Sequence, residues 1–165
     1  MTEKAKLQIE VREALPADIE DIVEIWWQLS SEHVDRDSEF WRLIPEHEAR
    51  SSFQEYANEL FGTPDHVLLV AEIQGQVAGF IHGSIRTRPP VMKLVTIGRI
   101  DEVSVHKDFR GQGVGRKILI AILDELKERG LSHVELMVDV DNPAAINLYK
   151  SAGFCNRQSQ MVKKL

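Results

Sequence analysis

Alternating apolar and polar residues predict a strand near the start of the chain, and a helical pattern follows it. Between residues 7 and 14, apolar side chains take every second position, as in a half-buried strand: Leu7, Ile9 and Val11. From Pro16 onward the apolar residues are spaced for one face of a helix: Ile19, Ile22, Val23 and Trp26. A second helix is expected over residues 46–61, and Gly62 and Pro64 end it.

The middle of the chain has the pattern of a β-meander. Residues 67–73 and 77–85 are apolar, strand-like runs separated by the turn Gln74-Gly75-Gln76, so we expect them to pair antiparallel. Residues 94–105 read as a further long strand. An amphipathic helix follows this strand after a glycine-rich loop, with an apolar residue every fourth position at Val114, Ile118, Ile122 and Leu126.

Gly130 closes this helix, and residues 133–140 form the next expected strand. A strand, a helix and a strand in this order form a βαβ unit, which places the two strands parallel. Asn142 then has the chemistry of an N-cap and Pro143 that of a first helical residue, which predicts a short helix up to Ala152. Gly153 suits a left-handed position after this helix, and residues 154–162 are expected to form a closing strand.

Composition indicates one compact domain covering residues 1–165. A chain of this length, with 43% hydrophobic and 28% charged residues, can bury a substantial core, and it contains no repeat or linker. No apolar run approaches the roughly 20 residues needed to cross a bilayer, and residues 1–7 lack a signal-peptide core, so we expect a cytoplasmic protein without a membrane partner. The net charge of -6 argues against nucleic-acid binding and suits a cationic substrate.

Cysteine and histidine usage adds two expectations. The single cysteine, Cys155, can form no intramolecular disulfide and is interpreted as a small core residue. The six histidines lack metal-ligand spacing, so no metal site is expected. Homodimerisation is common among small enzymes, but the sequence does not show which face would pair.

The glycine loop is the main candidate for a binding site, and it reads Arg110-Gly111-Gln112-Gly113-Val114-Gly115. Backbone N–H groups at the start of a helix can bind phosphate or pyrophosphate, and the missing side chains let a ligand approach them. A Walker loop would need Gly-Lys-Ser/Thr, whereas Arg116, Lys117 and Ile118 follow Gly115. A Rossmann fingerprint starting at Gly111 would need a glycine where Arg116 stands.

Residues 100–115 resemble the principal cofactor motif of the GNAT superfamily of N-acetyltransferases. The family pattern Arg/Gln-x-x-Gly-x-Gly/Ala is matched at each fixed position by the residues from Arg110 to Gly115. A second family hallmark, a helix that ends in a tyrosine followed by a Gly-Phe pair, is matched by Tyr149, Gly153 and Phe154. The resemblance covers the whole chain, although the first 65 residues match only in outline.

This resemblance implies an α/β (α+β) fold: a mixed, mostly antiparallel twisted sheet with flanking helices and a central parallel βαβ unit. It also implies acetyl-CoA as the acyl donor. The pyrophosphate would bind the amides from Arg110 to Gly115, including those of Gln112, Gly113 and Val114. The pantetheine arm would pair with the strand segment Val103-Ser104-Val105 as an added strand does. Val103 and Val105 can serve in the core through their side chains at the same time.

Four further residues receive roles from the resemblance. Glu102 is the first candidate for the base that deprotonates the substrate amine, with an ordinary exposed or ion-paired carboxylate as the alternative. Tyr149 would protonate the departing sulfur, unless it is only a buried aromatic. Arg116 would add charge near the phosphates or be a solvated helix residue. Asn142 would contact the pantetheine arm or act only as an N-cap.

Strand alternation places Asp101 on the face opposite Glu102. The resemblance also implies that the backbone N–H of Val105 stabilises the oxyanion of the tetrahedral intermediate. The leading function is therefore acetyl-CoA-dependent N-acetylation of a primary amine of unknown class. The alternatives are a regulatory module that binds acyl-CoA with little turnover and a purely structural domain, which would leave the glycine loop unexplained.

Overall fold

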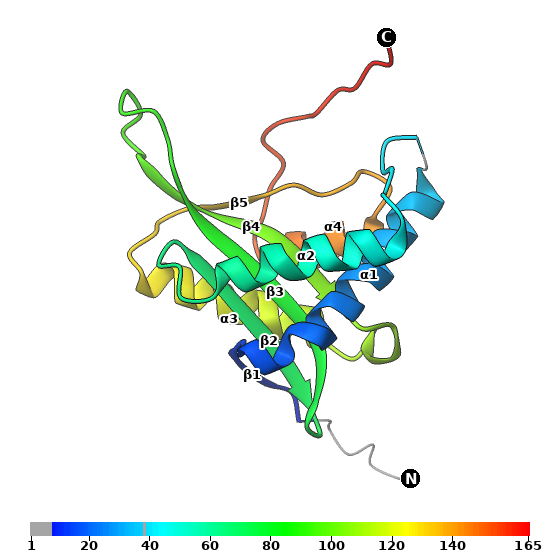
Figure 1. The fold of residues 1–165 in the computed structure, drawn as a ribbon. Coiled ribbons are helices and arrows are strands. Elements are labelled where there is room, and N and C mark those ends of the chain that lie inside the picture. The colour runs from blue at the N-terminus through cyan, green and yellow to red at the C-terminus, as the bar shows by residue number, and fades with distance from the viewer. Residues whose placement is uncertain (1–7, 38) are drawn as a thin grey trace, which may run out of the picture.

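A computed structural model describes residues 8–37 and 39–165 of the chain, and a five-stranded sheet forms its centre (Figure 1). The strands are β1 (Glu10–Glu13), β2 (His66–Ile73), β3 (Gln76–Thr87), β4 (Thr96–Val105) and β5 (Val134–Leu136). They lie in chain order, β1-β2-β3-β4-β5. The first four pair antiparallel and β5 pairs parallel to β4, which confirms the predicted meander and βαβ unit.

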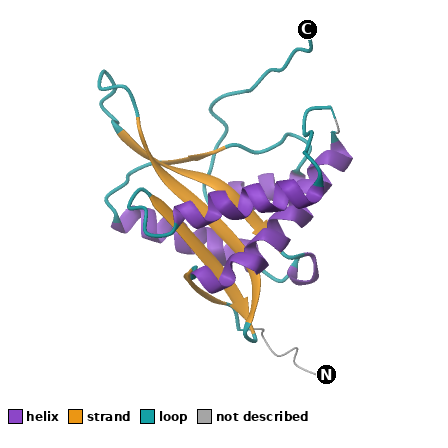
Figure 2. Cartoon of the chain, in the orientation of Figure 1, coloured by secondary structure: helices purple, strands orange, loops and turns teal. Residues whose placement is uncertain are grey.

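Helices cover both faces of this sheet (Figure 2). On one face lie α1 (Ile19–Arg36), which follows the 3-10 turn η1 (Pro16–Asp18), and α2 (Glu46–Leu60). On the other lies α3 (Val114–Glu128), after the 3-10 turn η2 (Lys107–Phe109), and the short helix α4 (Pro143–Ser151) follows β5. No helix among the described residues is long and apolar enough to span a bilayer.

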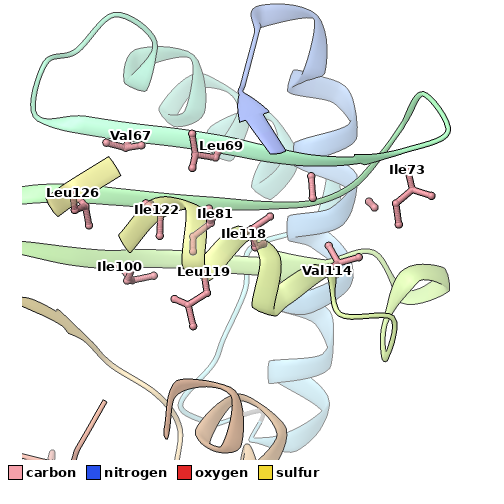
Figure 3. Close-up of a cluster of buried hydrophobic side chains, with 12 residues drawn as sticks. Val67, Leu69, Ile73, Ile81, Ile100, Val114, Ile118, Leu119, Ile122 and Leu126 are labelled. Carbon is pink, nitrogen blue, oxygen red and sulfur yellow. The ribbon is translucent and has the colours of Figure 1, made fainter. Parts of the chain in front are cut away.

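The sheet separates two clusters of buried side chains. Figure 3 shows the larger one, between the sheet and α3, where Ile118, Ile122 and Leu126 are fully buried as their spacing predicts. The second cluster packs α1 and α2 on the opposite face and includes Ile22, Phe53 and Phe80. Burial of both faces fixes the register of β3 and β4, because a slip of one residue would exchange the two apolar sets.

The end of the chain differs from its prediction. The closing strand expected over residues 154–162 is wrong, since this segment forms no strand and leaves the fold as an extended tail (Figure 1). Its polar run, Asn156 to Gln160, offers no alternating apolar face that a sheet could bury. The core assignment of Cys155 is also wrong, because the chain turns outward after Phe154 and exposes the thiol.

The strand and helix limits also shift. The structure gives β5 only three residues where the sequence predicts residues 133–140, and it gives β1 four, Leu7 lying outside the described residues. Without a closing strand, the parallel pair of β4 and β5 lies at an edge of the sheet instead of its centre. The predicted cap of α4 is confirmed, with Ala145 N donating to Oδ1 of Asn142 at 3.2 Å.

Candidate active site

The glycine loop connects η2 to the first turn of α3. Gly111 and Gly113 have φ angles of 74° and 88°, in the left-handed region that favours glycine, and Gly113 is the N-cap of α3. As a glycine, Gly113 has no side chain of its own that could cap this helix. The N–H groups of Val114, Gly115 and Arg116 have no acceptors within the helix, which makes this end of α3 suitable for an anion.

Side-chain hydrogen bonds hold the loop in this shape. Arg110 Nε donates to the carbonyl oxygen of Val105 at 3.0 Å, and its Nη1 donates to Oε1 of Glu32 in α1 at 2.7 Å. Gln112 Nε2 donates to the carbonyl oxygen of Asp108 at 2.9 Å. Sequence reasoning assigned the loop but missed Glu32, because a contact between residues 78 apart leaves no local signal.

Other loop residues divide between core and surface. The side chain of Val114 is buried in the cluster under α3, so that only its backbone faces the loop. Arg116 is exposed and lines a hollow between α3 and α4, together with Ser151 and Ala152. Its side chain can therefore reach a ligand that extends from the loop along α3.

The C-terminal half of β4 has a free edge next to this loop. His106 N donates to the carbonyl oxygen of Ala78 in the β3 direction, so alternation turns the N–H and C=O groups of Val103 and Val105 toward the opposite edge. On that edge β5 pairs only with Gly98 to Ile100 in the described part of the chain. An extended ligand could therefore pair with the backbone of Val103 and with the N–H of Val105, whose carbonyl oxygen already accepts from Arg110.

Ser104 lies differently from its two neighbours. Its side chain is 3% exposed, and its hydroxyl donates to the carbonyl oxygen of Ile25 in α1 at 3.1 Å. Its backbone faces β3, where it pairs with Phe80. Ser104 therefore links β4 to α1 through its side chain. Of the segment from Val103 to Val105, only the backbones of Val103 and Val105 face the open edge.

A β-bulge changes the predicted direction of Asp101. The pairing between β3 and β4 passes from His82↔Glu102 to Gly83↔Ile100, which leaves Asp101 as the extra residue. Its carboxylate accepts a hydrogen bond from Ser84 and pairs with Arg86 and Arg99. The prediction that Asp101 faces away from Glu102 is wrong, because the bulge interrupts alternation and puts both carboxylates on the α1–α2 side.

Glu102 is half-buried, and its electrostatic setting suits a base. Burial raises the pKa of its carboxyl to about 7, and the negative charge of Asp101 acts in the same direction. A carboxyl with such a pKa is poised to accept a proton near neutral pH, which an ordinary exposed glutamate is not.

Tyr149 lies in α4, within electrostatic range of Glu102. It packs against the cluster under α3, and its ring makes an edge contact with Phe154 at 5.9 Å between centroids. Burial, followed by the charge of Glu102, raises the pKa of its hydroxyl to about 12. Tyr149 therefore stays protonated at neutral pH and keeps a proton to donate. The free β4 edge, the loop amides, Glu102 and Tyr149 meet in one region.

A model of the acetyltransferase (GNAT) family matches residues 20–154. The chain belongs to the GNAT family of acetyltransferases. The family and the mixed α/β fold predicted from the two sequence motifs are therefore confirmed. The match begins in α1 and ends at Phe154, so it includes the loop, the β4 edge and α4.

Individual relatives share parts of this GNAT chain. A mycothiol acetyltransferase from Renibacterium salmoninarum is 36% identical over 87 residues, which are 53% of this chain and 25% of the relative. The chain thus spans about a quarter of that relative's length. The solved BH1408 protein from Bacillus halodurans, in a tetramutant form, has a TM-score of 0.82 at 23% identity over 94% of this chain and 99% of its own, which shows the same fold.

One solved neighbour of this GNAT chain contains the expected acyl donor. It is a predicted acetyltransferase from Clostridium acetobutylicum with acetyl-CoA, with a TM-score of 0.71 and 19% identity. The similarity covers 95% of this chain and 96% of the neighbour. The common fold includes the place where our chain presents its loop amides and its open β4 edge.

Proposed function

We propose that this chain is an N-acetyltransferase that transfers an acetyl group from acetyl-CoA to a primary amine by direct attack in a ternary complex. The observation that carries the proposal is the β4 edge beyond Ile100, which β5 leaves unpaired in the described part of the chain and which leads to the glycine loop. Glu102 lies on this strand, and Tyr149 is within electrostatic range of it. A purely structural domain needs neither an open strand edge nor a carboxyl whose pKa is raised to about 7.

The chain would hold acetyl-CoA through backbone groups. The amides of Val114, Gly115 and Arg116 suit the pyrophosphate, because they lie in the first turn of α3, at its positive end, and have no acceptors within the helix. The backbones of Val103 and Val105 suit the amide groups of the pantetheine arm, in the manner of strand addition. Acetyl-CoA held in this way would have its thioester, which supplies the activated acetyl group, near Glu102.

Glu102 would prepare the acceptor. An aliphatic amine with a reference pKa near 10.4 is almost entirely protonated at neutral pH and cannot attack a carbonyl carbon. Glu102 accepts one proton from this ammonium group, which leaves a neutral amine as the nucleophile. The net charge of -6 is compatible with such a cationic acceptor.

Two groups would then assist the transfer. The N–H of Val105 faces the open edge and can donate to the oxyanion that forms when the amine attacks. The C–S bond breaks as the carbonyl re-forms, and Tyr149 donates its proton to the departing thiolate. The products are the acetylated amine and the free thiol of CoA.

The test has two parts, binding and turnover. Binding of acetyl-CoA should raise the melting temperature of the chain by mass action, and free phosphate should do much less. Release of the CoA thiol, followed over a panel of small amines, polyamines and peptides, should depend on the amine added. Binding without transfer to any amine would contradict the proposal and favour the regulatory module.

A further inference from the structure

A line of three side chains runs beside Glu102 on the face covered by α1 and α2. His82 of β3 is directly opposite Glu102 in the antiparallel register, so their side chains lie on the same face. His82 is 1% exposed. His66 of β2 and Tyr56 of α2 contact its ring from two sides.

The two histidines are arranged edge to edge. His66 Nδ1 lies 2.8 Å from His82 Nε2, with ring centroids 5.1 Å apart and planes only 20° from parallel. If the hydrogen bond lies in the plane of both rings, their centroids are separated by the N–N distance plus roughly one ring radius for each ring. The observed centroid distance matches this sum, so the two rings meet edge to edge. On the other side, the Tyr56 hydroxyl is 3.4 Å from His82 Nδ1.

One set of tautomers orients all three groups in the same direction. The Tyr56 hydroxyl donates to Nδ1 of His82, the Nε2–H of His82 donates to Nδ1 of His66, and half-buried His66 keeps its Nε2–H for the solvent side. Burial lowers the pKa of His82 to about 4, so its ring is neutral at neutral pH and has one free lone pair.

Tyr56, which is 41% exposed, forms the end of this line nearest the carboxylates of the candidate site, and no hydrogen bond among the described residues joins it to them. Burial raises the pKa of Tyr56, and the charges of Asp101 and Glu102 raise it further, which puts its hydroxyl within electrostatic range of both. Asp101 is paired with Arg86 and Arg99, whereas no ion pair within the described residues involves Glu102. Of the two carboxylates, Glu102 is therefore the one available to exchange protons.

We propose that Tyr56, His82 and His66 form a relay that carries the proton taken up by Glu102 out to solvent. This inference rests on the proposed function, in which Glu102 receives one proton from the substrate ammonium. Tyr56 accepts that proton, directly or through one water molecule, and passes its own to Nδ1 of His82. His82 releases its Nε2 proton to Nδ1 of His66, and His66 releases its Nε2 proton to water. One proton enters and one leaves, so Glu102 is again ionised.

The relay addresses a specific difficulty of this site. A half-buried base with a pKa of about 7 keeps its proton for part of the time at neutral pH, and in that state it cannot deprotonate the next amine. Acetyl-CoA on the β4 edge and the acceptor amine would also restrict water around Glu102. With both substrates bound, the line of Tyr56, His82 and His66 would give the proton a further way out, through half-buried His66.

The experiment compares His66→Gln and Tyr56→Phe with His47→Gln, a change at a histidine in the first turn of α2 whose side chain is 83% exposed. Turnover of an identified amine is measured at saturating acetyl-CoA in dilute buffer from about pH 6 to pH 9 and with added imidazole. We expect His66→Gln and Tyr56→Phe to lower kcat at neutral pH about 10-fold, less than the roughly 10²- to 10⁴-fold cost of losing an acid or base itself. The KM for acetyl-CoA should stay unchanged.

Rescue separates a relay from simple packing. Added imidazole should restore the kcat of both variants, because a mobile proton acceptor can replace the missing exit, and it should not affect His47→Gln. Turnover of both variants within twofold of the parent chain, without buffer dependence, would refute the relay and leave the proposed function intact. Failure of the parent chain to acetylate any amine would refute the proposed function. A melting curve checks folding, and if His66→Gln unfolds, Tyr56→Phe at a partly exposed position decides the question.

Discussion

A Cβ atom on Gly115 would lie 3.4 Å from Cδ2 of Leu148, so the first turn of α3 packs directly against α4. Leu148 precedes Tyr149 in the chain. The amides proposed to hold the pyrophosphate and the hydroxyl proposed to protonate the sulfur are therefore attached to two helices in mutual contact. Small shifts of the loop should reach Tyr149 through this contact.

Replacement of Gly113 by alanine should weaken acetyl-CoA binding and destabilise the fold by about 1 kcal/mol. No atom lies within 4 Å of the added Cβ, so the cost comes from the φ angle of 88°, which alanine adopts poorly. Gly130→Ala is a matched control, since Gly130 has a φ of 85° and equally open surroundings at the far end of α3. Calorimetric titration should show weaker binding only for Gly113→Ala, and equal affinities would contradict the loop assignment.

Glu102→Gln should lower turnover most at neutral pH. The variant lacks a proton acceptor, and a higher pH partly replaces it because more of the amine is then already neutral. In the parent chain kcat/KM should rise with pH as Glu102 ionises with its pKa of about 7. Rate profiles of both proteins check this, and full activity of Glu102→Gln near pH 7 would exclude Glu102 as the required base.

The same variant should also change how stability depends on pH. The pKa of Glu102 is raised from 4.5 to about 7 in the folded state, so folding favours the protonated carboxyl. This contribution is fully present below pH 4.5 and is lost as the pH rises through about 7. The substituted glutamine side chain is uncharged at every pH, so Glu102→Gln should gain up to about 3 kcal/mol relative to the parent between these limits. Denaturant unfolding below pH 4.5 and above pH 7 measures the difference in the free energy of unfolding between the two proteins. A difference that does not change with pH would show that folding does not raise the pKa of Glu102.

Tyr149→Phe should reduce kcat by roughly 10²- to 10⁴-fold, as expected for a general acid. The ring contact with Phe154 and the packing under α3 should survive, since only the hydroxyl is removed. Affinity for acetyl-CoA should change far less than turnover. Single-turnover kinetics with an identified amine measure the chemical step, and an unchanged rate at saturating acetyl-CoA would make Tyr149 a packing residue.

Features with local chemical signals could be predicted from the sequence. The left-handed glycine at position 153, the Asn142 cap and the four-residue spacing of α3 each need only a few neighbouring residues to be recognised. The glycine loop, the βαβ unit and α4 therefore lie where the pattern puts them. The prediction of a closing strand was wrong because a strand depends on a pairing partner elsewhere in the chain, and a short polar segment does not reveal whether it has one.

Features that depend on distant contacts could not be predicted. His82 stands within an apolar run, and only the fold brings Tyr56 and His66 to its ring. The Asp101 bulge leaves no mark in the hydrophobic pattern, so the alternation rule assigned its side chain to the wrong face. The candidate base and acid were found through resemblance, but their unusual pKa values follow from burial that composition cannot show.

The bulge at Asp101 also has a consequence for changes in chain length. It divides β4 into two segments, one bonded to β5 and one free, whose side-chain alternations differ by one step. A deletion at position 101 would be absorbed by closing the bulge, while Val103 and Val105 keep their direction. A deletion at Val103 would instead shift the alternation of the following residues by one position, so that the backbone N–H and C=O of Val105 point toward β3 and away from the open edge. Length variation in this strand should therefore be tolerated at one position and damaging two residues later.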